Sequence, residues 1–313
     1  MAATDHARWI VNLCWDDLPG EVRRQATLCL TDIIATAAGA KLLGLPAEGI
    51  DAALGMAEYY APMSPMLRCT DNPSVVKDAA GPGGWAAAMA LAMARRNMVG
   101  LPSIFSSEPL GREQAETLGG EWLILRQYFK PYPTCRWAQP AVEGLKLLQA
   151  EHGFEAVDVE RIDIETFACA ADLMHFPPEH TDAAQYSLPW AVAAQLVDGA
   201  LGVAQMHPDR LADPEVLAAG RRVYTSLAPD LEARFPEEAL ARTAVTLTDG
   251  RRLTSPTMAA RGDWADPLSP EELAQKAERL MVGGLGEERA TRLLDMLATL
   301  SERPAGDLLE ELR

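Results

Sequence analysis

Apolar residues recur every three to four positions over most of the N-terminal third of the chain, which is the spacing of amphipathic helices. On this pattern we predict helices over 8–17, over 19–44 and from Pro46 to Pro62. The segment 84–98 is rich in Ala and Met and apolar nearly all round, which predicts a buried helix. The first part of the chain is therefore predicted to be helical.

The period of the pattern changes after residue 129. Residues 159–166 alternate between apolar and polar, as in a half-buried strand. Residues 243–248 and 252–254 flank the turn dipeptide Asp249-Gly250, which predicts a hairpin. Helices are predicted around Val142 to Leu148, over 186–198 and over 213–226. Since strands and helices do not alternate regularly, a parallel doubly wound sheet is disfavoured.

Helical spacing returns near the C-terminus. Ser269 is followed three positions later by Glu272, which is the spacing of a capping box. The pattern then stays helical through Leu309, with a glycine break over 283–286. The predicted fold is mostly α with an α+β part. A helical domain is built from both chain ends, 1–128 and 264–313, and an α+β domain, 129–263, is inserted between them.

Composition excludes several classes of protein. The 313 residues carry a net charge of −17, which repels nucleic acid and anionic membranes, so neither is an expected partner. The five cysteines form no C-x-x-C pair and the five histidines no i, i+4 pair, so we expect no disulfide framework and no metal site. No signal core or membrane-spanning apolar stretch is present, which makes the cytoplasm the expected compartment. Motifs of zinc hydrolases, serine hydrolases and P-loop proteins are absent.

Candidate chemistry is densest at Lys77 and in the run from Tyr128 to Gln139. Two prolines stiffen this run, and the helix start at Pro140 offers free N–H groups to an anion such as a carboxylate. The polar and aromatic residues gathered there are Lys130, Tyr132, Cys135, Arg136 and Trp137. Taken alone, these residues favour an ordinary stiff crossing between domains over a site.

Three ordered motifs change that balance. The segments 130–144 and 184–199, and Val76-Lys77 followed by 83–88, resemble the 2-methylcitrate dehydratase and cis-aconitate decarboxylase family (MmgE/PrpD). The resemblance implies a helical body with a smaller α+β lid and a cleft between them. It also implies homodimers and chemistry without a cofactor on a small carboxylate substrate.

The same resemblance assigns roles to single residues. Lys77 matches the family's active-site lysine, which would neutralise a substrate carboxylate or stabilise an enolate-like charge, and is otherwise a surface lysine. Arg136 would bind a carboxylate or form a structural ion pair. Cys135 is more consistent with packing than with a nucleophile. The expected substrate contacts are Lys130, Cys135, Arg136, Gln139, Ser187 and Trp190.

The chain departs from the family pattern where proton transfer is concerned. An Asp-rich, His-containing helical segment is missing, because Thr36 to Lys41 join what should be two distant segments. Gln139 stands where histidine is common and Trp190 where tyrosine is usual, and neither side chain titrates near neutral pH. His180 and Tyr132 are the remaining candidates for moving a proton, although His180 also fits an exposed loop histidine.

Two hypotheses follow. In the first, the chain is a diverged lyase or isomerase in which Lys77 and Arg136 hold a small carboxylic acid. In the second, it is a non-catalytic carboxylate-binding protein or partner subunit that keeps the family scaffold. Loss of the helical segment should expose apolar faces, so a homodimer that buries the helix over 85–98 is expected.

Overall fold

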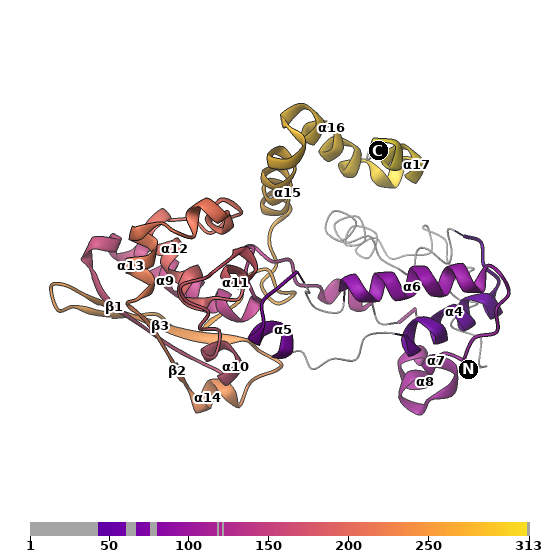
Figure 1. Cartoon of the computed structure of the whole chain (residues 1–313), viewed down its shortest axis with the longest axis horizontal. Helices are drawn as coiled ribbons and strands as arrows, with labels where there is room; N and C mark the ends of the chain where they lie inside the picture. Colours follow the sequence, from indigo (N-terminus) through magenta and orange to yellow (C-terminus); the bar gives the residue numbers. More distant parts are fainter. Residues whose placement is uncertain (1–42, 61–66, 76–79, 118, 121, 312–313) are drawn as a thin grey trace. The chain divides into compact units, whose positions relative to one another are not determined.

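The computed structural model describes residues 43–60, 67–75, 80–117, 119–120 and 122–311. The chain divides into two compact units, which are described separately. Unit 1 comprises Met1–Pro65, Lys77–Gln127 and Glu271–Arg313, and unit 2 comprises Met66–Val76 and Tyr128–Pro270. The described chain is mostly helical with one small mixed sheet, as predicted (Figure 1).

Unit 2 is built on a five-stranded sheet. Its strands are β1 (Val159–Thr166), β2 (Val223–Leu227), β3 (Leu240–Leu247), β4 (Arg252–Thr254) and β5 (Met258–Ala259). The order is β2-β1-β3-β4, and β5 also pairs with β3. Strands β1 and β2 are parallel, whereas β3 is antiparallel to β1, β4 and β5. The predicted strand over 159–166 and the predicted hairpin are both confirmed.

The alternation along β1 explains its two faces. Ile162 and Ile164 are fully buried, and Asp163 between them lies on the opposite face. On that outer face Asp163 accepts hydrogen bonds from Arg161 at 2.7 Å and from Arg252 at 2.9 Å. One face of the sheet therefore supports the core, and the other carries exposed ion pairs.

Helices α9 and α12 pack against the inner face of the sheet, and α13 packs against α12 (Figure 1). The helices of unit 2 are α5 (Leu67–Asp71), η3 (Arg136–Ala138), α9 (Gln139–His152), η4 (Ala156–Asp158), α10 (Ala168–Ala171), α11 (Thr181–Gln185), α12 (Leu188–Asp198), η5 (Ala204–Met206), η6 (Pro208–Arg210), α13 (Pro214–Gly220) and α14 (Pro229–Glu232). Side chains of these layers form one continuous core, with Leu145, Ile162 and Trp190 among its largest fully buried members. This core fixes α9, which begins directly after the loop with the candidate site.

Helix α9 approaches β3 closely at Gly144. A Cβ atom at Gly144 would lie 2.8 Å from Thr243 Oγ1 and 3.0 Å from Ser255 Oγ. The Thr243 hydroxyl donates a hydrogen bond of 3.1 Å to the carbonyl oxygen of Ala141, one turn earlier on α9. Because Gly144 has no side chain, α9 and β3 lie close enough for the hydrogen bond from Thr243 to Ala141 to form.

The predicted helix over 213–226 is wrong in its second half. Helix α13 ends at Gly220, and β2 begins at Val223. Gly220 lies so close to Phe176 that a Cβ would be 2.3 Å from its ring. Val223 then pairs with Ile162 of β1. Pairing with a distant strand, which local periodicity does not register, decides the structure of 223–226.

Unit 1 contains α4 (Ala47–Tyr59), α6 (Ala80–Ala94), α7 (Ile104–Ser107), α8 (Pro109–Glu116), η2 (Leu123–Arg126), α16 (Glu287–Ala298), η7 (Leu300–Glu302) and α17 (Ala305–Glu311). Helix α15 (Pro270–Leu285) begins at the last residue of unit 2 and continues in unit 1. Gly286, with φ of 79°, separates α15 from α16, which confirms the predicted glycine break. The predicted helices over 8–17 and 19–44 lie outside the described residues.

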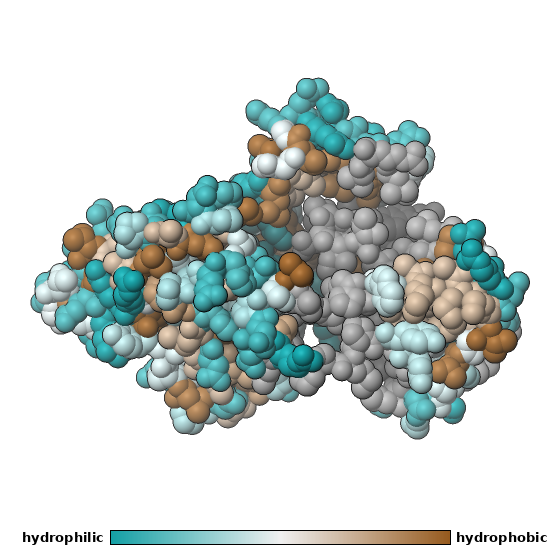
Figure 2. All heavy atoms as spheres, in the orientation of Figure 1, coloured by the Kyte–Doolittle hydropathy of each residue, from teal (hydrophilic) through white to brown (hydrophobic). Residues whose placement is uncertain are grey.

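Helices α4 and α6 pack through small side chains, with Ile50 and Met56 facing Ala90 and Ala94 in one buried cluster. The predicted helix over 84–98 is present but shorter, and within the described chain Ala86, Ala90 and Ala94 are its buried side. Helix α6 ends at Ala94, and Trp85 is 67% exposed. Figure 2 shows a pale tan patch in the region of α4 and α6. A uniformly apolar composition does not distinguish a helix buried on one face from one buried on all sides.

Candidate functional site

The loop from Tyr128 to Gln139 is fastened at both ends within unit 2. The Phe129 N–H donates to the Gly262 carbonyl oxygen at 2.9 Å, and the Cys135 N–H donates to the Gln185 carbonyl oxygen at 2.8 Å. Gly262, with φ of 94°, is required there because a Cβ would lie 2.1 Å from the Phe129 oxygen. The loop is thus held by backbone hydrogen bonds to Gly262 and to Gln185.

Gln139 organises the inside of the loop. Its side chain is fully buried, and its Nε2 donates to the carbonyl oxygens of Thr134 at 3.1 Å and Tyr132 at 3.3 Å. The Tyr128 hydroxyl donates to Gln139 Oε1. Both amide hydrogens and the amide oxygen therefore have partners within the loop. The geometry gives Gln139 a positioning role, and direct contact with a substrate stays a prediction.

Arg136 is the cationic centre of the loop. Its guanidinium carbon lies 4.8 Å from the centroid of the Tyr128 ring, and its Nη2 forms an ion pair with Asp263 Oδ2. The other oxygen of Asp263 accepts from the Trp264 N–H at 2.7 Å. Arg136 Nε is buried and has no hydrogen-bond partner among the described residues. Arg136 therefore combines a structural ion pair with a buried donor that has no acceptor among the described residues.

The phenol of Tyr128 is a neutral donor at this centre. Burial raises the pKa of Tyr128 well above its ordinary value; Arg136 lowers that pKa, and Asp263 and Glu143 raise it further. The net direction is upward, so the hydroxyl keeps its proton at every physiological pH.

A second polar group continues along α9. The Tyr132 hydroxyl donates to Glu143 Oε1 at 2.6 Å, and Lys146 Nζ donates to the same hydroxyl oxygen at 2.6 Å. Lys146 Nζ also lies 3.8 Å from Glu143 Oε2 and 5.1 Å from the centroid of the Tyr132 ring. Burial, and after it the negative charge of Glu143, raises the pKa of Tyr132 far above its ordinary value. The phenol is therefore held neutral between a base and a cation.

Sequence reasoning missed Glu143, Lys146 and Asp263. A signal for the first two was present, because Gln139, Glu143 and Lys146 are spaced by four and three residues and so share one face of α9. Asp263 lies more than a hundred residues from Arg136, so no local pattern relates the two.

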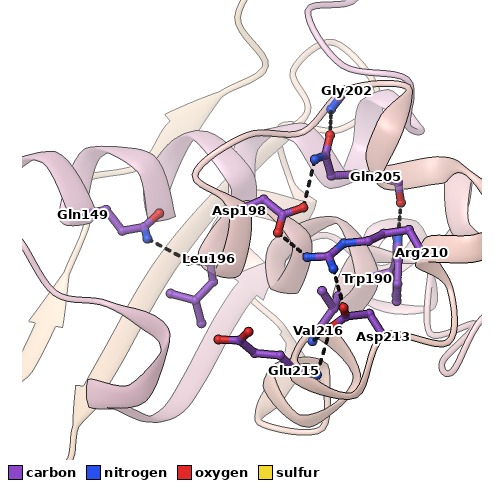
Figure 3. A network of polar contacts seen from close by, with 10 residues as sticks. All are labelled: Gln149, Trp190, Leu196, Asp198, Gly202, Gln205, Arg210, Asp213, Glu215 and Val216. Carbon is purple, nitrogen blue, oxygen red and sulfur yellow. Dashed lines mark hydrogen bonds and ion pairs between the residues drawn. The ribbon is translucent and has the colours of Figure 1, made fainter.

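Trp190 and Ser187 lie in the core of unit 2. Trp190 is fully buried, and its indole N–H donates to the Gln205 carbonyl oxygen at 3.1 Å (Figure 3). The buried Ser187 hydroxyl accepts from the Trp190 backbone N–H at 3.2 Å and so caps α12. Gln205 donates in turn to Asp198, which pairs with Arg210. In this arrangement both polar side chains serve the packing of α12, and their contact with a substrate stays a prediction.

The remaining predicted residues occupy different environments. His180 is exposed, and its Nδ1 accepts the Ala183 N–H at 3.1 Å as the N-cap of α11. Lys130 is exposed, and Cys135 is half-buried against the core. Lys77 lies outside the described residues. The loop therefore brings together Tyr132, Arg136 and Gln139. The roles expected for Lys130, Cys135 and His180 remain predictions.

Two further findings concern the described residues as a whole. Within them, no group of three or more His, Cys, Asp or Glu side chains is arranged to hold a metal ion. No helix among the described elements has the length and apolar character needed to cross a membrane.

Fold and loop together define an α+β unit that carries an arginine-centred polar cluster at the start of a core helix. The family model of the MmgE/PrpD C-terminal domain matches residues 132–302, more than half of the chain. The chain therefore belongs to the MmgE/PrpD family.

The chain is also similar to two relatives named cis-aconitate decarboxylase. It is 27% identical over 163 residues to the protein of Mus musculus and 28% identical over 162 residues to that of Homo sapiens. Each match covers 50% of this chain and 33% of the relative, so the similarity spans about a third of the length of these relatives.

Proposed function

We propose that this chain binds a small carboxylic acid at Arg136 and acts on it, without a cofactor, as a diverged lyase or isomerase. Dehydration, decarboxylation, epimerisation and cyclisation are the reaction types in question. The observation that carries the proposal is Arg136, a half-buried cation with an unpaired buried donor, in a chain whose family includes relatives named cis-aconitate decarboxylase. Lys77 is proposed as a second group that stabilises negative charge on the substrate.

The physical argument for Arg136 rests on its hydrogen-bonding capacity. A guanidinium has five N–H donors, and the ion pair with Asp263 engages only one of its nitrogens. A buried donor without an acceptor costs roughly 1–3 kcal/mol, which a ligand carboxylate at Nε would recover. The neutral Tyr128 ring beneath the guanidinium adds a cation–π contact that holds its plane.

The test has two stages. Thermal shift is measured first with a panel of carboxylates: succinate, malate, citrate and cis-aconitate. Every binder is then incubated with the protein and followed by proton NMR for product formation. We expect at least one binder, a product, and loss of that product in Lys77→Ala with thermal stability unchanged. Full turnover in Lys77→Ala would remove Lys77 from the proposal, and the absence of any binder would overturn it altogether.

The alternative is a non-catalytic carboxylate-binding protein or partner subunit. It is favoured by the fact that Gln139 and Trp190 hold no titratable proton and already have partners in this structure. In the same experiment this alternative requires a binder that gives neither product nor exchange of protons with solvent.

A further inference from the structure

Glu143, Tyr132 and Lys146 form a continuous line of hydrogen bonds from the interior to the surface. The side chain of Glu143 is 11% exposed and that of Lys146 is 40% exposed, and the buried Tyr132 hydroxyl lies between them. Both bonds measure 2.6 Å, within the range of charge-assisted hydrogen bonds. The ammonium therefore donates to the phenol, and the phenol donates to the carboxylate.

This line is joined to the Arg136 cluster. Tyr128 lies under Arg136 and donates to Gln139, whose Nε2 donates to the backbone oxygen of Tyr132. Glu143 follows Gln139 by one helical turn, and its charge acts on both tyrosines. Hydrogen bonds through Gln139 thus connect the line to Tyr128 under Arg136, and Lys146 is the more exposed end of the line.

We propose that Glu143 is the proton-transferring residue of this site and that Lys146 supplies it with protons through the hydroxyl of Tyr132. The proposal rests on the proposed function. It places the acid–base group on α9, in a chain that has Gln139 and Trp190, which do not titrate, where the family commonly has histidine and tyrosine.

The Lys146 ammonium gives a proton to the Tyr132 oxygen while the Tyr132 hydroxyl gives its proton to the Glu143 carboxylate. This leaves a neutral Glu143 acid and a neutral Lys146 amine, which takes a proton from water. When the C–C bond of a bound carboxylate breaks and carbon dioxide leaves, the electron pair stays on carbon. Neutral Glu143 protonates that carbon and returns to a carboxylate, so one solvent proton is consumed.

The pKa of Tyr132 supports this role, because a phenol held far above its ordinary pKa passes a proton on without remaining ionised. A purely structural cluster would need only the charge of residue 146. The two roles therefore differ in what Lys146→Arg would do: arginine keeps the positive charge and the contact with the Tyr132 ring, but does not give up a proton in a protein.

The experiment measures binding and turnover in heavy water with the same carboxylate panel. Binding is followed by calorimetry, and turnover by deuterium entering a panel member or its product. We expect Tyr132→Phe, Glu143→Gln and Lys146→Arg each to bind as wild type but to incorporate deuterium roughly 100-fold more slowly, the usual scale of a general acid–base group. Glu165→Gln, which removes an exposed carboxylate paired with Arg242, is the matched control and should behave as wild type.

Each other outcome overturns the relay. Unchanged rates in Lys146→Arg and Tyr132→Phe would show that no proton passes along the line. Weaker binding in step with slower turnover would assign the cluster a structural role. If the wild type binds a carboxylate but moves no proton, the relay fails while the carboxylate site stands. If the wild type binds none, the proposed function fails and the relay fails with it.

Discussion

Substitution of Gly144 by alanine tests the packing that places the polar face of α9. In an open helix position, Gly→Ala is favourable by about 1 kcal/mol. Here the new Cβ would lie 2.8 Å from Thr243 Oγ1 and 3.0 Å from Ser255 Oγ. Thr243 cannot rotate away freely, because its hydroxyl donates to Ala141 and its N–H donates to Ser255 Oγ.

The magnitude follows from these terms. Overpacking of a well-packed core costs about 1–3 kcal/mol, and loss of one buried hydrogen bond costs roughly 1 kcal/mol more. After subtraction of the helix-propensity gain, Gly144→Ala should lower the free energy of unfolding by about 1–3 kcal/mol. Urea denaturation followed by circular dichroism measures the change.

Gly284→Ala is the matched control. Gly284 lies in α15, and a Cβ there would meet no atom within 4 Å. Gly284→Ala should therefore raise the free energy of unfolding of this part of the chain by about 0.5–1 kcal/mol. The reasoning is refuted if Gly144→Ala is as stable as the wild type, because α9 and β3 would then not be in the close contact described.

Three further predictions concern the loop, the tyrosines and the assembly. Gln139→Ala removes three buried hydrogen bonds and should destabilise the protein by about 2–4 kcal/mol in urea denaturation; a loss below 0.5 kcal/mol would contradict its positioning role. The raised pKa values of Tyr128 and Tyr132 keep both protons bound in the folded state. Stability from this source is complete below about pH 10 and falls as pH rises beyond it, by up to about 1.4 kcal/mol per unit for each tyrosine. Above about pH 10, the free energy of unfolding should fall less in the variant with phenylalanine at both positions than in the wild type. An equal fall in the two proteins would refute the raised pKa values. Light scattering at micromolar concentration should give a dimeric mass, and a monomeric mass would refute the expected burial of α6.

Prediction from the hydrophobic periodicity succeeded where the local sequence determines the element. The strand over 159–166 alternates because only one face of β1 meets the core, and Asp249-Gly250 sets the following hairpin locally. It failed at 223–226, where pairing with β1 decides the structure. It located α6 but neither its end at Ala94 nor its buried face, because an alanine-rich composition is apolar all round.

The candidate site was predictable as a location but not as a set of contacts. The prolines and the arginine marked the loop, since both are visible in the sequence. The bonding of Gln139 depends on how the loop folds back, and the partner of Arg136 comes from Asp263, far along the chain. The burial of Trp190 depends on the packing of α12 against its neighbours.

Calorimetric titration of a binding carboxylate into Arg136→Gln tests the central claim most directly. Loss of one charge-assisted contact, worth about 1.5–3 kcal/mol, should weaken binding roughly 10- to 100-fold. Arg234→Gln is the control, because Arg234 is an exposed arginine paired with Glu238. The account predicts wild-type affinity for Arg234→Gln and weakened affinity for Arg136→Gln. Equal affinities in wild type and both variants would contradict it.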